Sequence, residues 1–228
     1  MGHSSADDKI LSYNDVVLRR SDLDILSGPC FLNDRIIEFY FSYLSSSHPS
    51  EDILLVPPSI AFWITNCPDA EDLKDFVAPL KLSDKELVIF PVNNNDDVEQ
   101  AEGGSHWSLL AYMRKANLFV HHDSSGRMNE PYARQLYKAV IKYLSVSGSV
   151  SDAKFQHWSG SPQQLNGYDC GLYVTAITRT ILDWFEDTEH RDTGDLWFCA
   201  VKEKGTPSVV AGMRNEILQL IKRVMIPE

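Results

Sequence analysis

The sequence predicts one α+β domain, because the patterns typical of helices and of strands occupy separate stretches of the chain. Apolar residues recur at helical spacing before residue 80 and after residue 130, and runs typical of strands lie between residues 87 and 122. Helices followed by strands and then by more helices are typical of the α+β class. The chain has 228 residues, of which 43% are hydrophobic, so it is long and apolar enough for a substantial core.

The N-terminal end is the least regular part of the pattern. Residues 1–9 are polar and we expect them to be flexible, so that the folded domain would span residues 10–228. Residues 10–26 mix short apolar runs with charges and fit either extended segments or short turns. A break at Ser27-Gly28-Pro29 separates this stretch from the first clear helix.

Three helices are predicted before the strands. Asn33 or Asp34 can begin the first one, because short polar side chains accept hydrogen bonds from the free N–H groups of a first turn. Pro57-Pro58-Ser59 begins the second, since proline suits the start of a helix. Residues 69–80 fit the third.

A buried strand and a hairpin follow in the middle of the chain. Residues 87–92 form a short continuous apolar run, and the runs 107–113 and 118–122 are separated by a four-residue turn. The polar loop 93–104 between them carries no structure signal, and loops of this length in compact domains are often functional.

The last part of the chain predicts a helix over residues 131–145, a possible strand over 153–158 and a C-terminal helix over 207–225. Between them, the apolar residues after Cys170 fall on one stripe of a helix, with Asp169 as its N-cap. A thiol in the first turn lies at the positive end of the helix dipole, which favours the nucleophilic thiolate. The alternative is a small buried cysteine with no chemical role.

The numbers of His106 and Asp123 sum to 229, and pairing across a turn centred near residues 114–116 joins residues whose numbers sum to about 229 to 231. Strand pairing would therefore place them opposite or diagonal to each other on one face. A histidine oriented by a carboxylate is the base half of a nucleophilic triad, and Cys170 is the candidate nucleophile. Gln164 and the N–H of Cys170 would hold the oxyanion, and Gly171 would admit a substrate backbone. The alternative for His106 and Asp123 is a surface pair without catalytic function.

Charge and cysteine content exclude several classes. A net charge of −11 argues against a nucleic-acid or membrane-surface protein. The four cysteines are widely spaced and favour neither zinc nor disulfides, and His121 and His122 lack companion ligands, so we expect no metal. Without a recognisable signal peptide or transmembrane run, we expect a reducing compartment, the cytosol, the nucleus or both.

Three segments together resemble the Ulp/sentrin-type cysteine proteases, which cleave ubiquitin-like modifiers. They are Gly104-Ser105-His106-Trp107-Ser108-Leu109-Leu110, His122-Asp123-Ser124, and Pro162-Gln163-Gln164 with Asn166-Gly167 and Asp169-Cys170-Gly171. The resemblance covers nearly the whole chain. It implies a papain-like fold, with a small mixed sheet flanked by helices and the active site between two lobes. It also implies catalysis by His106, Asp123, Cys170 and Gln164 without a cofactor.

Within that family the chain is most similar to the deneddylase branch, which acts on the Nedd (Rub) modifier. The features are Phe31-Leu32-Asn33-Asp34, the Asn/Asp-rich loop 93–104 and the lack of a long N-terminal extension. The resemblance implies precursor processing and deconjugation, cullin-type conjugates as substrates, and a monomer. The alternatives are a SUMO-specific protease, a deubiquitinase, an inactive modifier-binding module and an acyltransferase.

The resemblance also implies a narrow tunnel for the modifier's Gly-Gly tail. Asp34 and the loop with Asn95, Gly103 and Gly104 would contact the tail, and Phe31 and Trp107 would line the tunnel. The family usually has Trp where Phe31 stands, so this chain keeps an aromatic wall but lacks the indole N–H. The acidic charge would attract the arginines of such tails.

Overall fold

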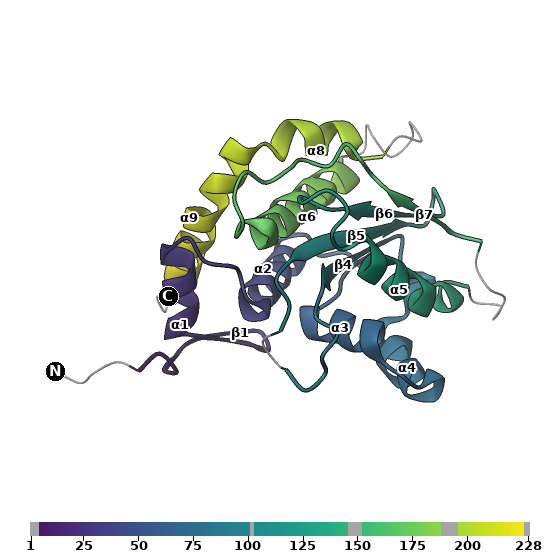
Figure 1. The fold of residues 1–228 in the computed structure, drawn as a ribbon, viewed down its shortest axis with the longest axis horizontal. Helices are drawn as coiled ribbons and strands as arrows, with labels where there is room; N and C mark the ends of the chain where they lie inside the picture. Colours follow the sequence, from purple (N-terminus) through teal and green to yellow (C-terminus); the bar gives the residue numbers. More distant parts are fainter. Residues whose placement is uncertain (1–4, 101–102, 146–151, 188–195, 226–228) are drawn as a thin grey trace.

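The computed structural model of the chain describes residues 5–100, 103–145, 152–187 and 196–225. A five-stranded mixed sheet crosses the molecule, and helices cover both of its faces (Figure 1). The strand order is β3-β4-β5-β6-β7, with β3 parallel to β4, β6 parallel to β7 and antiparallel pairing between β4, β5 and β6. The strands are β3 Ile53–Leu55, β4 Leu87–Asn93, β5 Trp107–Met113, β6 Leu118–His122 and β7 Lys154–His157. The α+β prediction is confirmed.

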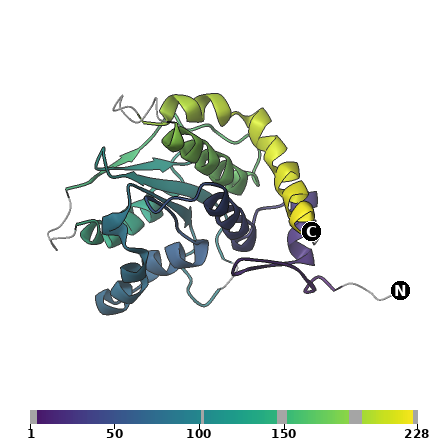
Figure 2. The same ribbon diagram turned by 180° about the vertical axis from the view of Figure 1, so that it is seen from behind.

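The described helices group on the two faces of this sheet. Helices α2, α6, α8 and α9 lie on one side and α3, α4 and α5 on the other, and α2 and α6 are also neighbours when seen from behind (Figure 2). The helices are α1 Arg20–Ser27, α2 Asp34–Ser47, α3 Pro58–Asn66, α4 Ala70–Val77, α5 Glu130–Val140, α6 Cys170–Glu186, α8 Phe198–Lys204 and α9 Pro207–Val224. None of the helices in the described ranges is long and apolar enough to span a membrane.

The central strands bury both of their faces, which explains their nearly continuous apolar sequences. In β5, Leu109 and Ala111 pack into the core shared with α2, α6 and α9. Leu110 and Tyr112 point the other way, into the core beneath α3 and α5. The sheet therefore separates two packed layers.

The N-terminal stretch is more ordered than the sequence predicts. The carbonyls of Ala6 and Asp8 accept hydrogen bonds from the N–H groups of Ser21 and Arg20, at 3.0 Å each. Lys9 already belongs to strand β1 (Lys9–Tyr13), which pairs with β2 (Val16–Arg19). The regular structure thus begins at Lys9, one residue before the predicted start of the folded domain, and residues 1–4 lie outside the described residues.

Most predicted helices are confirmed, with changes at their ends. Asn33 caps α2, its side chain accepting from the N–H of Ile36 at 3.1 Å. The helix predicted over 69–80 ends at Val77 and continues as a 3-10 turn that contains Pro79. Helix α8 was not predicted, because seven residues are too few for a clear helical period.

Candidate active site

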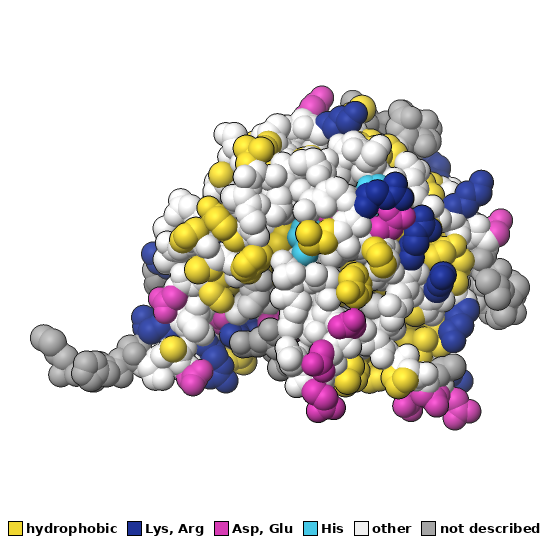
Figure 3. Space-filling view, in the orientation of Figure 1, with side chains coloured by type: hydrophobic (Ala, Val, Ile, Leu, Met, Phe, Trp, Pro, Cys, Tyr) yellow, Lys and Arg dark blue, Asp and Glu magenta, His cyan; other side chains and the backbone are white. Residues whose placement is uncertain are grey.

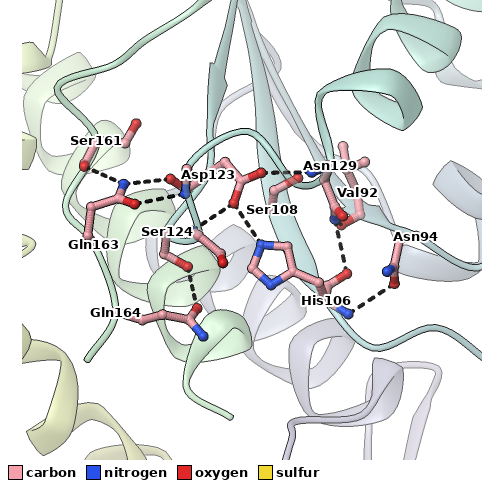
Figure 4. Close-up of polar contacts among 12 residues, drawn as sticks. Val92, Asn94, His106, Ser108, Asp123, Ser124, Asn129, Ser161, Gln163 and Gln164 are labelled. Carbon is pink, nitrogen blue, oxygen red and sulfur yellow. Dashed lines mark hydrogen bonds and ion pairs between the residues drawn. The ribbon is translucent and has the colours of Figure 1, made fainter. Parts of the chain in front are cut away.

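The hairpin brings His106 and Asp123 together, as the residue spacing predicts. Leu109 pairs with His122, so Asp123 lies diagonally across from His106 at the mouth of the hairpin. Nε2 of His106 lies 2.7 Å from Oδ1 of Asp123, and both side chains are buried (Figure 4). The alternative of a surface pair is therefore excluded by their burial.

The carboxylate of Asp123 is held by three donors. Besides His106, the backbone N–H of Ser125 donates to Oδ1 at 2.9 Å and that of Asn129 donates to Oδ2 at 2.8 Å. Burial alone would raise the pKa of Asp123, but these hydrogen bonds outweigh it and lower the pKa below its usual value. Asp123 is therefore ionised at neutral pH and fixes the histidine ring in one orientation.

Asn129 is a buried residue of the site that the sequence analysis missed. Its side-chain Nδ2 donates to the carbonyls of His106 at 3.0 Å and Val92 at 3.1 Å, while its N–H holds Asp123 (Figure 4). One residue thus ties the end of β4 to both members of the His–Asp pair. The sequence offers no signal for it, because asparagine is common in turns for purely local reasons.

The charge of His106 is stabilised inside the protein. Burial would lower its pKa, but hydrogen bonds with Asp123 and Cys170, together with their charges, raise the pKa to about 9. Because Nε2 is engaged by Asp123, Nδ1 is the ring nitrogen left for the thiol. His106 therefore stays protonated at neutral pH and can give a proton to a leaving group.

Cys170 begins α6, where the apolar stripe predicts it. Its side chain is buried and hydrogen-bonded to His106. The first turn of a helix leaves N–H groups unpaired, and the helix dipole adds positive potential there. This position stabilises the negative charge of a thiolate and of an oxyanion.

Two residues beside Cys170 differ from their predicted roles. Asp169 occupies the N-cap position, but its side chain makes no capping hydrogen bond. Its carboxylate accepts instead from Arg214 at 2.9 Å and from Asn166 at 2.7 Å. Leu32 fills the space beside Gly171, since a Cβ at residue 171 would lie 2.8 Å from the Cβ of Leu32. The group that lies close to Gly171 is therefore the side chain of Leu32. The expectation that a substrate backbone approaches Gly171 is corrected accordingly.

Gln164 lies beside the histidine–aspartate pair, on the segment that leads to Cys170. Its Oε1 accepts from the hydroxyl of Ser124 at 2.7 Å, and its Nε2 donates to the carbonyl of Asn166 at 2.6 Å (Figure 4). An amide nitrogen carries two protons, so the second proton on Nε2 remains available to an oxyanion.

A groove of about 570 Å³ reaches His106 from the side of α3 and the loop before β5. It is lined by all six residues predicted to bind substrate: Phe31, Asp34, Asn95, Gly103, Gly104 and Trp107. The structure brings these six residues into one groove, which His106 also lines. The indole N–H of Trp107 donates to the carbonyl of Leu32 at 2.9 Å. This hydrogen bond holds the segment before α2, which includes Phe31, against the start of β5.

The polar loop beside the groove is more regular than the sequence predicts. The side-chain oxygens of Asn93, Asn95 and Asp97 each accept from the N–H two residues later, at 2.8 to 3.0 Å. These successive Asx turns explain why Asn or Asp stands at each of the positions 93, 95 and 97. Asn94 Oδ1 accepts from the N–H of His106 at 3.0 Å, which connects the loop to the catalytic histidine. Residues 101–102 lie outside the described residues.

Gly104 has a conformation that other residues rarely adopt. Its φ is +82°, and a Cβ there would lie 1.9 Å from Oδ1 of Asn93. At Gly103 a Cβ would lie 2.4 Å from the side chain of Asn95. Both glycines are therefore required by the tight turn of the groove wall.

Negative and positive side chains lie on different parts of the surface around the groove. Asp34 and Glu99 line the groove, and Asp96 and Asp97 are exposed beside it. Exposed Lys and Arg side chains lie over α5 on the other side, and hydrophobic side chains surround a histidine in the middle of this face (Figure 3). The exposed cations of this region are Arg127, Arg134, Lys138 and Lys142.

His121 and His122 are buried and hydrogen-bonded to neighbouring side chains. His121 lies between Ser108 and His157, and His122 accepts from the indole N–H of Trp197 at 2.8 Å. Burial lowers the pKa of His121 to about 4 and that of His122 to about 3, so both are neutral. Within the described ranges, no group of three His, Cys, Asp or Glu side chains could hold a metal ion.

Comparison with known proteins agrees with this geometry. Residues 30–191 match the Ulp1 protease family, C-terminal catalytic domain. The chain belongs to the Ulp1 protease family. It is a cysteine peptidase, and its His–Asp pair and buried Cys170 lie within the part that matches the family.

Two curated members of the Ulp1 family extend the match over more of the chain. The NEDD8-specific protease 1 of Arabidopsis thaliana is 57% identical over 225 residues, which cover 99% of this chain and 97% of that protein. The human sentrin-specific protease 8 is 35% identical over 182 residues, which cover 78% of this chain and 84% of that protein.

A solved structure shares the fold. The Ulp1 protease domain in complex with Smt3, the yeast orthologue of SUMO, aligns with a TM-score of 0.66 over 95% of this chain and 88% of that chain. The two sequences are 21% identical, so this likeness concerns the fold alone. It agrees with the papain-like arrangement that the sequence predicts.

Proposed function

We propose that this Ulp1-family peptidase cleaves after the C-terminal Gly-Gly of the NEDD8 (Rub) modifier. The observation that supports this most is the 57% identity, over nearly the full length, to a protease named for NEDD8. The chain also has the buried His106–Asp123 pair, with Cys170 hydrogen-bonded to the same histidine. Both processing of a modifier precursor and removal of the modifier from conjugates require this cleavage.

In this proposal Cys170 is the nucleophile. Its thiolate attacks the carbonyl carbon of the last glycine, and the oxyanion accepts hydrogen bonds from Gln164 and the N–H of Cys170. Protonated His106 gives its proton to the nitrogen of the leaving amine, and the C–N bond breaks to leave a thioester. Water then attacks the thioester, His106 takes its proton, and the thiolate is released. Asp123 keeps His106 oriented throughout.

The groove would hold the modifier's tail. Phe31 and Trp107 both line the groove, and in this proposal the tail passes between these two rings, which selects two glycines over larger residues before the scissile bond. Asp34 and Glu99 place negative charge along the groove, which suits a basic tail. Asn95, Gly103 and Gly104 shape the part of the groove wall that the loop 93–104 provides.

The cellular setting is part of the same proposal. We infer that the substrates include cullin-type conjugates and that the enzyme acts as a monomer in the cytosol or nucleus. Support for a reducing compartment comes from the four cysteines, all of which are free.

The test is hydrolysis of three modifiers, NEDD8, SUMO and ubiquitin, each carrying a C-terminal fluorogenic group. The proposal expects NEDD8 to be cleaved at least a hundredfold faster than the other two (about 3 kcal/mol in transition-state binding). Cys170→Ala should cleave none of them but should still bind NEDD8. Preference for SUMO would contradict the choice of modifier, and wild-type inactivity on all three would favour a binding module or an acyltransferase.

A further inference from the structure

The exposed large hydrophobic side chains of the described residues are not scattered. Three of them, Phe31, Trp63 and Val98, line the groove. Two more, Met128 and Leu165, lie on the loops that follow Asp123 and precede Cys170, and neither lines the groove. Single exposed apolar residues are ordinary, but five of the six such side chains lie next to the catalytic residues or the groove.

Met128 and Leu165 are each next in sequence to a residue of the catalytic arrangement. Leu165 is 83% exposed and directly follows Gln164, the proposed oxyanion donor. Met128 is 52% exposed and directly precedes Asn129, whose N–H holds Asp123. Both side chains are therefore exposed to solvent next to residues that are themselves fixed by hydrogen bonds.

Four hydrogen bonds hold the two loops together. The hydroxyl of Ser124 donates to Gln164 Oε1 at 2.7 Å, and the N–H of Gln164 donates to the carbonyl of Ser124 at 2.9 Å. Gln163 Oε1 accepts from the N–H of Gly126 at 2.8 Å, and its Nε2 donates to the carbonyl of Asp123 at 2.9 Å. Because of these bonds, Met128 and Leu165 are carried by one rigid unit rather than by two independent loops.

The position of this unit identifies what it would face. In the proposed function the groove holds the chain before the scissile bond, so the leaving group needs a surface outside the groove. The loops 124–129 and 162–169 flank Asp123 and Cys170 in sequence, and none of their residues lines the groove. In an isopeptide conjugate the leaving group is a lysine with four methylene groups, attached to a folded protein. Such a stem is apolar up to its nitrogen.

We propose that Met128 and Leu165 form a leaving-side contact, which binds the aliphatic stem of the modified lysine and the protein surface around it. The contact would favour conjugates over modifiers with small leaving groups, and so would make deconjugation the preferred reaction. This inference rests on the proposed function, because it assumes cleavage after the modifier's Gly-Gly.

The experiment compares two substrates of the same NEDD8: a C-terminal fluorogenic derivative and a NEDD8–cullin isopeptide conjugate. The variants are Leu165→Ser, Met128→Ser and the double change, with Val209→Ser as a matched control. Val209 is 40% exposed on α9 and lies outside the groove and both loops. Thermal unfolding of each variant checks that it is folded.

The double variant should lose roughly tenfold in kcat/KM on the conjugate and no more than twofold on the fluorogenic substrate, since burial of one or two apolar side chains has effects of this size. Val209→Ser should match wild type on both. Equal losses on both substrates, or no loss on the conjugate, would overturn the leaving-side contact alone. Wild-type inactivity on both substrates would overturn the proposed function and this inference together.

Discussion

The two sides of His106 are built in different ways. On the catalytic side, His106, Asp123 and Asn129 are buried and joined by side-chain and backbone hydrogen bonds of 2.7 to 3.0 Å. On the groove side, an exposed loop made of Asx turns and two tightly placed glycines forms the wall. In the proposed function, the chemistry would therefore depend on the packed core and recognition on a surface loop. Substitutions should therefore affect kcat on the first side and KM on the second.

The largest effect that would separate the two sides is expected from Asp123→Asn. An amide cannot hold the protonated imidazole as the carboxylate does, so kcat should fall on the order of a thousandfold or more while KM changes little. Kinetics with fluorogenic NEDD8 give both constants. A kcat within tenfold of wild type would remove Asp123 from the mechanism.

The glycines of the groove provide the second test. Gly104→Ala should raise KM at least tenfold, because the new Cβ would collide with Asn93 and distort the wall. Gly126→Ala is the matched control, since Gly126 also has a positive φ, of +68°, but a Cβ added there would meet no atom within 4 Å. Both variants should lose similar backbone stability, and only Gly104→Ala should lose substrate affinity. Equal KM values for the two variants would contradict a binding role for this turn.

The pH profile offers a third test, confined to the catalytic side. The pKa of His106 is raised to about 9, so its proton is present through neutral pH and is lost as the pH rises through about 9. The rate should fall on that alkaline limb, because the leaving amine then lacks a proton donor. In Asp123→Asn the limb should move down by about one to three pH units, since the partner that raises the pKa is gone. A limb at the same pH in both proteins would show that another group titrates.

The smallest effect is expected at Phe31, on the groove side. Phe31→Trp should lower KM by no more than about threefold and leave kcat unchanged, because a larger ring adds contact area to a wall that is already aromatic. Phe31 is 49% exposed, so the larger side chain has room. A change in kcat would mean that the groove and the catalytic side are coupled.

The catalytic pair could be predicted from the sequence because it depends on local geometry. A hairpin with a short turn fixes which residues face each other, so His106 and Asp123 could be paired from their distances to the turn. The apolar stripe after Cys170 likewise places the thiol at a helix start, as the structure has it. Residues 87–92 and the hairpin strands could be predicted for the same reason.

The parts that could not be predicted depend on contacts between distant residues. Asn129 bonds the carbonyl of Val92, 37 residues away, and Asp169 bonds Arg214, 45 residues away. Gly171 packs against Leu32 from another element. Sequence patterns report local periodicity and helix caps, so they predict a cap at Asp169 and a substrate contact at Gly171. In the folded chain, Asp169 instead bonds Arg214 and Gly171 packs against Leu32.

The most direct test of the central claim is to trap the enzyme with NEDD8 that carries a C-terminal electrophile, and to identify the modified cysteine by peptide mapping. The test is demanding, because Cys170 is buried in the free protein whereas Cys30 is exposed next to Phe31. We predict a stoichiometric adduct on Cys170 that forms with NEDD8 but not with SUMO, and that is absent in Cys170→Ala. An adduct on Cys30, or none on Cys170, would contradict the account.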